Sequence, residues 1–128
     1  MVNTTPALTP TTHQRLRVVI GTYVAIVSLT VATLAVLSAA AADQAPSEAW
    51  VHAVIVAVFA ALLPVRLKSA ARGSVGGLRA VGIICAVVFV VNVVESLLTM
   101  FPTWMRVEMI VIALLMLVGV GLVIRERV

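Results

Sequence analysis

The sequence predicts an all-α integral membrane protein, with four transmembrane helices in a compact antiparallel bundle. Two observations predict this class. Of the 128 residues, 62% are hydrophobic and 11% are charged, against about 45–50% and 25% in ordinary soluble domains. The apolar residues also gather in four long runs, each near the roughly 20 residues that a helix needs to cross a bilayer core. This composition excludes a soluble globular enzyme, a disordered chain and a disulfide scaffold.

The four runs define the domain organisation. They are predicted to span the membrane at residues 18–42, 49–65, 80–101 and 105–124. Together they form one transmembrane domain over residues 18–128, and residues 1–17 are predicted to be a polar cytoplasmic tail. Helices are favoured over strands because a helix satisfies its own backbone groups in lipid. No run alternates polar and apolar residues as a barrel strand would.

The first run has an alternative interpretation as a secretory signal. Arg15 and Arg17 would form its positive region, and the small residues at 38–42 resemble a cleavage site. The apolar run from 18 to 42 is longer than the roughly 7–15 residues of a signal core. We therefore expect an uncleaved membrane anchor.

Basic residues predict the orientation. One side of the four spans is assigned a single basic residue, Arg106, together with the acidic residues Asp43, Glu48 and Glu108. Eight of the nine Lys and Arg residues flank the spans on the other side: Arg15, Arg17, Arg66, Lys68, Arg72, Arg79, Arg125 and Arg127. Because cytoplasmic loops carry the excess of Lys and Arg, both termini are predicted to be cytoplasmic, with Trp50 and Trp104 at the outer interface.

The same charge pattern bears on partners and location. Anionic lipid headgroups are candidate partners of the basic loop residues Arg66, Lys68, Arg72 and Arg79, although the orientation rule explains these residues without lipid binding. The basic residues lie at the ends of apolar runs and form no separate patch, so nucleic acid is not an expected partner. Ala and Val are abundant and Arg outnumbers Lys, which favours a bacterial protein of the cell (inner, cytoplasmic) membrane.

Small residues predict the packing faces, since helices in lipid associate by close backbone approach. The second span carries an Ala ladder at intervals of four residues: Ala49, Ala53, Ala57 and Ala61. The first span carries what we call the Gly21–Ala39 seam, at intervals of four and three residues: Gly21, Ala25, Ser28, Ala32, Ala35 and Ala39. The seam is expected to pack against protein. Its partner is another helix of the chain, a second copy in a homo-oligomer, or another membrane protein.

The third span holds the unusual chemistry. Glu95 lies about 22 Å along the helix from Ala80, which places it in the outer third of the membrane. A carboxylate at that depth costs about 2–3 kcal/mol or more unless it is protonated, paired or hydrated. Asn92 and Ser96 share its helix face. Candidate partners at similar depth are His52 and Arg106, and Asn92 is a further hydrogen-bond donor.

Two interpretations of this polar group remain open. In the first it is a proton or cation site in which Glu95 titrates and His52 is a second titrating group. In the second it is a buried structural pair, or Glu95 extends outward to the headgroups. The sequence places no second carboxylate or histidine close enough to specify a metal site. No metal and no cofactor are therefore expected.

Three classes of function follow, and none is enzymatic. The sequence has no glycine-rich phosphate loop, no metalloprotease histidine pair and no nucleophile with a base in reach. The primary expectation is an accessory or structural protein that assembles with itself or with a membrane partner. The alternative is a small oligomeric transporter or channel that uses Glu95, Asn92 and His52. The third is a holin-like protein that makes membrane lesions.

Overall fold

The computed structural model describes residues 9–99 and 101–127 of the chain. The described elements are α1 (Pro10–Ala40), the short 3-10 turn η1 (Ala42–Gln44), α2 (Ser47–Ala71), α3 (Val75–Ser96) and α4 (Thr103–Arg127). Each of the four α-helices is long and apolar enough to cross a membrane. The predicted all-helical class, with four helices that could each span a membrane, is therefore confirmed.

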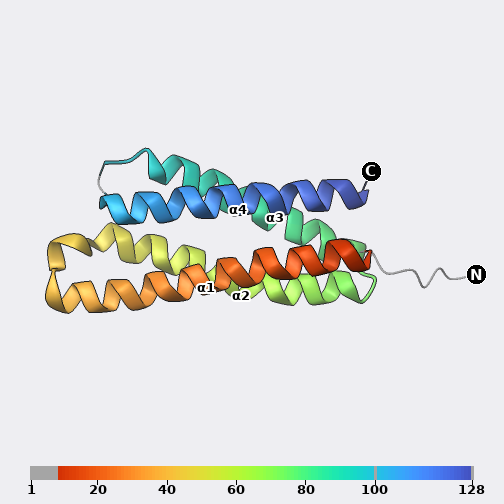
Figure 1. Ribbon diagram of the computed structural model, residues 1–128, viewed down its shortest axis with the longest axis horizontal. Helices are drawn as coiled ribbons and strands as arrows, with labels where there is room; N and C mark the ends of the chain where they lie inside the picture. Colours follow the sequence, from red (N-terminus) through yellow and green to blue (C-terminus); the bar gives the residue numbers. More distant parts are fainter. Residues whose placement is uncertain (1–8, 100, 128) are drawn as a thin grey trace, which may run out of the picture.

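The helices form one elongated bundle (Figure 1). Helix α1 packs against α2 and α4, and α3 packs against the same two helices. The α1–α2 and α3–α4 connections lie at one end of the bundle, and the α2–α3 connection lies at the other, near the C-terminus. We call the first the tryptophan end, because Trp50 and Trp104 lie in the first turns of α2 and α4. We call the second the basic end.

Helix α1 begins earlier than the predicted span. It starts at Pro10, so residues 10–17 of the predicted polar tail are helical, and residues 1–8 lie outside the described part of the chain. Thr9 caps the helix, since its side chain accepts a hydrogen bond from the Thr12 backbone at 3.4 Å. The Glu126 carboxylate of α4 accepts from the Thr9 backbone at 2.6 Å and from the Thr12 hydroxyl at 3.2 Å. The Thr9 cap and the bonds to Glu126 thus stabilise an N-terminal extension of α1 that precedes its apolar run.

Helix α3 also differs from the predicted span at 80–101. It runs from Val75 to Ser96, because the Ser74 hydroxyl caps it by accepting from the Gly77 backbone at 2.9 Å. Phe101 lies after the end of the helix and is buried in the turn. The apolar run thus includes a residue that packs back onto the bundle instead of continuing the span.

The turn from α2 to α3 depends on one glycine. Gly73 has a φ of 98°, which only glycine adopts without strain. Its backbone N–H donates to the Ala70 carbonyl, and the Ser74 N–H donates to the Ser69 carbonyl, both at 3.1 Å. These two bonds form a Schellman motif, which ends α2 and satisfies its last carbonyls.

Two apolar clusters fill the interior. The larger, which we call the long cluster, includes Leu16, Leu63 and Val81 and continues to Val56 and Ile112. The smaller, which we call the end cluster, lies at the tryptophan end and consists of Leu34, Ala49, Ala53, Phe101, Met105 and Met109. Outside the bundle many large apolar side chains are exposed, as expected for a surface in contact with lipid.

The two predicted small-residue faces differ in exposure in the structure. All six residues of the Gly21–Ala39 seam are exposed, so the seam does not pack within the described chain. In the α2 ladder, Ala49 and Ala53 are buried, Ala57 is half-buried and Ala61 is exposed. The expectation that the seam packs against protein stays a prediction, and it now concerns a neighbour outside the chain.

The closest approach of α2 and α3 yields a stability prediction. A Cβ atom on Gly77 would lie 2.7 Å from Ser69 Cβ and 2.8 Å from the Ala70 backbone nitrogen. We expect Gly77→Ala to lower the free energy of unfolding by about 1–3 kcal/mol, although alanine favours helices by up to about 1 kcal/mol. Thermal unfolding in detergent measures this.

The matched control is Gly121→Ala, since no atom lies within 4 Å of a Cβ at Gly121. This variant should be as stable as the wild type or slightly more stable. A Gly77→Ala protein as stable as Gly121→Ala would contradict the close packing of α2 on α3.

Candidate functional site

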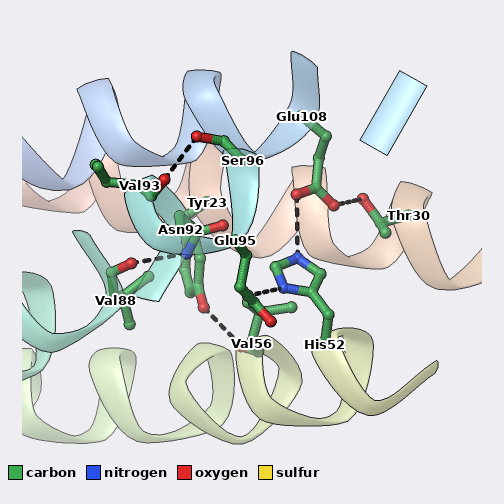
Figure 2. Close-up of polar contacts among 10 residues, drawn as sticks. All are labelled: Tyr23, Thr30, His52, Val56, Val88, Asn92, Val93, Glu95, Ser96 and Glu108. Carbon is green, nitrogen blue, oxygen red and sulfur yellow. Dashed lines mark hydrogen bonds and ion pairs between the residues drawn. The ribbon is translucent and has the colours of Figure 1, made fainter. Parts of the chain in front are cut away.

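His52 is the centre of a buried polar group near the tryptophan end. It lies in the second turn of α2, and its side chain has 0% exposure. Its Nδ1 lies 2.5 Å from Glu95 Oε1 on α3, and its Nε2 lies 3.3 Å from Glu108 Oε1 on α4. Figure 2 shows the imidazole between the two carboxylates. Phe101 meets the ring edge-on, with 6.0 Å between ring centroids.

Helix α1 completes the group through Thr30. The Thr30 Oγ1 lies 2.6 Å from Glu108 Oε2 and 2.9 Å from the Ile26 carbonyl oxygen. Each of the four helices thus contributes one side chain at the same level (Figure 2). We call Thr30, His52, Glu95 and Glu108 the polar layer. It lies between the end cluster on one side and the long cluster on the other.

The contacts of the polar layer fix how many protons it must hold. The Thr30 hydroxyl has one hydrogen and two acceptor neighbours, so when it donates to Ile26, Glu108 Oε2 must donate to Thr30. An imidazole donates from both ring nitrogens only as an imidazolium. Two arrangements with a protonated Glu108 then satisfy all four contacts: a doubly protonated His52 beside an ionised Glu95, or a neutral His52 that accepts from a protonated Glu95 and donates to Glu108. We adopt the first in the proposal below. The net charge is then zero, which an apolar interior favours.

The polar layer is reachable from the surface. The side chains of Glu95 and Glu108 are 17% and 9% exposed. A groove of about 280 Å³ between α1 and α4 is lined by Thr30 and Glu108, and also by Trp104. Glu108 thus borders a surface groove and is not enclosed by the long cluster.

The other predicted site residues bind backbone carbonyls. Asn92 is fully buried; its Nδ2 donates to the Val88 carbonyl at 2.7 Å, and its Oδ1 accepts no hydrogen bond from a described residue. The Ser96 hydroxyl donates to the Val93 carbonyl at 2.8 Å. Arg106 Nε donates to the Ser96 carbonyl at 2.9 Å, where a cation also opposes the negative end of the α3 dipole.

The predicted site residues thus fall into two groups. His52 and Glu95 are in contact, whereas Asn92, Ser96 and Arg106 lie nearby and bond to the backbone. Arg106 was a candidate partner of Glu95. In the described part of the chain, the ion-pair contact of Glu95 is with His52.

Two members of the polar layer were missed from the sequence. Glu108 was assigned with Arg106 to the outer side of the spans, although the predicted span at 105–124 contains it; in the structure it lies in the second turn of α4 and is mostly buried. Its position beside the buried Met105, Met109 and Ile112, at intervals of four and three residues, is the signal that could have revealed it. Thr30 was not among the predicted site residues; its hydroxyl contacts the Ile26 carbonyl of its own helix as well as Glu108.

The arrangement does not favour a metal site. Among residues 9–99 and 101–127, no group of three or more His, Cys, Asp and Glu side chains is placed to hold a metal ion. The reason is geometric, since Glu95 and Glu108 contact different nitrogens of the same ring. Their oxygens do not converge on one point.

The polar layer yields a second stability prediction. His52→Leu leaves two carboxyl groups without their shared donor, and we expect the free energy of unfolding to fall by about 3–5 kcal/mol, as when one partner of a buried ion pair is removed. Adding Glu95→Gln and Glu108→Gln to His52→Leu replaces the stranded carboxyl groups with neutral amides and should restore part of this loss. Denaturant unfolding in detergent compares the variants. A triple variant no more stable than His52→Leu would contradict the account.

Comparisons with family models, curated proteins and solved structures find no match to this chain. What the protein does must therefore be inferred from its own side chains. The polar layer is where buried, titratable groups from three helices meet, and such intramembrane groups are functional candidates by default.

Proposed function

We propose that this chain is a pH-responsive multi-pass membrane protein. In this proposal the polar layer binds and releases protons, and its protonation controls how the helices pack at the tryptophan end. The observation that carries the proposal is that one fully buried imidazole contacts two carboxyl groups. Both contacts are attractive only while the site holds its protons, because a bare ring nitrogen facing a carboxylate oxygen is repulsive.

The coupling between protons and packing follows from the contacts. When His52 loses one ring proton, one lone pair faces a carboxylate oxygen across 2.5 or 3.3 Å. The carboxylate then has to turn away, or its helix has to move. Glu108 also connects α4 to α1 through Thr30. Proton loss is therefore expected to loosen the contacts among α1, α2 and α4 at this end.

The long cluster favours a sensor over a proton channel. Its apolar side chains, Leu16, Leu63 and Val81 among them, fill the bundle between the polar layer and the basic end. Within the single chain, an apolar barrier therefore separates the polar layer from the basic end. No catalytic step is part of this proposal.

The orientation belongs to the same proposal. We place the protein in a bacterial cell membrane as an antiparallel bundle with both termini in the cytoplasm. The eight-to-one distribution of Lys and Arg supports this placement. The polar layer then lies in the outer half of the membrane and responds to the pH outside the cell.

The two tryptophans supply a direct test, because both lie at the tryptophan end and the chain has no others. Trp104 lines the groove beside Glu108, and Trp50 lies two residues from His52. We expect intrinsic fluorescence in lipid vesicles to change cooperatively with pH as the polar layer gains or loses a proton. His52→Gln and Glu108→Gln should abolish this transition.

Matched controls are His13→Gln, which removes the other histidine, and Glu48→Gln, which removes an exposed carboxylate at the tryptophan end. Both should keep the transition. A wild-type protein without a pH-dependent signal, or a transition that survives in His52→Gln, would overturn the proposal and favour a structural polar layer.

A second function is supported by the Gly21–Ala39 seam. Its six residues are all exposed, and exposed small residues at these intervals allow close approach of another helix in lipid. We propose that the protein assembles through this face with a second copy or with another membrane protein. This role is compatible with a pH-responsive polar layer.

Assembly is tested with one substitution on the seam. Ala32→Leu adds a branched side chain where a second backbone would approach, so we expect the oligomer to dissociate toward monomer in detergent. Native mass spectrometry measures the distribution of copies. Val118→Leu, on the exposed face of α4, is the control and should not change it. Equal distributions for wild type and Ala32→Leu would count against self-assembly through the seam.

A further inference from the structure

A groove of about 750 Å³ lies between the start of α1 and the end of α2, at the basic end. Its floor is apolar and includes Ile20, Val24 and Leu67, with Gly21 and Pro64 beside them. Its rim is formed by Arg17 of α1 and Lys68 and Arg72 of α2, together with His13. An apolar floor therefore leads toward a cluster of cationic side chains.

Two features keep the groove open. No atom lies within 4 Å of a Cβ placed on Gly21, so this part of the floor has no side chain to fill it. The Glu126 carboxylate of α4 binds the backbone of Thr9 and the hydroxyl of Thr12. These bonds hold the start of α1 toward α4.

We propose that this groove binds an anionic phospholipid, with an acyl chain on the apolar floor and the phosphate at the Arg17–Lys68–Arg72 rim. Charge complementarity supports this occupant, because three side chains of the described lining are cationic and none is acidic. From His13 to Val24 the helix rises about 16 Å. This matches about half of a bilayer core, the depth of one leaflet.

The same charges oppose a second copy of the chain as the occupant of this groove, which shares only Gly21 with the Gly21–Ala39 seam proposed for assembly. A copy in the same orientation would bring its own basic end to this depth, where like charges repel. Only two of the four basic loop residues predicted to bind lipid line the groove. Lys68 and Arg72 line it, whereas Arg66 and Arg79 do not. The inference is independent of the polar layer, which lies at the other end of the bundle.

The first experiment removes charge inside and outside the groove. The full-length protein in detergent is titrated with phosphatidylglycerol or phosphatidylcholine, and bound lipid is counted by native mass spectrometry. With about 1 kcal/mol per basic side chain near a membrane surface, Arg17→Gln with Lys68→Gln should weaken phosphatidylglycerol binding about 10- to 30-fold. Arg66→Gln with Arg79→Gln removes the same charge outside the groove and should change it less than about 3-fold. Equal losses in the two double variants would overturn the proposal.

The second experiment fills the apolar floor. Gly21→Leu places a side chain in the groove, whereas Gly121→Leu places the same side chain where no atom lies within 4 Å on α4. Only Gly21→Leu should lose bound phosphatidylglycerol, and wild type should prefer it to phosphatidylcholine. Glycerol 3-phosphate, a headgroup without acyl chains, should not displace the lipid at equal concentration. Displacement by it, or full lipid binding by Gly21→Leu, would contradict an acyl-chain site.

Discussion

The imidazole of His52 is fully buried and lies within hydrogen-bond distance of carboxyl groups from two other helices. Inside a membrane no bulk water replaces a lost partner, so these groups must satisfy one another. Hydrophobicity does little to fix the register of helices in lipid, because the lipid tails are as apolar as the side chains. The polar layer supplies that register, since Thr30, His52, Glu95 and Glu108 can meet only when the four helices stand at one relative height (Figure 2).

The same constraint links structure to protonation. The contacts of Thr30 with Ile26 and Glu108 need one hydrogen from the hydroxyl and one from Glu108, and the two contacts of His52 need two more protons. A fully bonded polar layer is therefore a neutral one. Removing one proton from the polar layer therefore both breaks a hydrogen bond and leaves a net negative charge in the interior. The end cluster and the long cluster confine this change to one level of the bundle.

The fold could be predicted from the sequence because four apolar runs in lipid leave few other solutions. The pairing of Glu95 with His52 was also within reach, since both lie at similar depth. Glu108 was missed because its charge assigned it to the outer side of the spans, whereas in the second turn of α4 it contacts His52 and is mostly buried. Arg106 binds the Ser96 carbonyl instead of Glu95, because the end of α3 leaves carbonyls unpaired. The intervals of Met105, Met109 and Ile112 could have revealed the inward position of Glu108, whereas no pattern in the sequence predicts the partner of Arg106.

The central claim is that His52 donates to Glu95 and Glu108 from both ring nitrogens. The most direct measurement is nitrogen NMR of ¹⁵N-histidine-labelled protein in lipid, in a His13→Gln background that leaves His52 as the single histidine. At neutral pH a free imidazole carries a proton on one ring nitrogen for most of the time. Our account predicts that both ring nitrogens of His52 are protonated, and that Glu95→Gln together with Glu108→Gln reverts it to the neutral form. An unprotonated ring nitrogen in the wild-type layer would contradict the account.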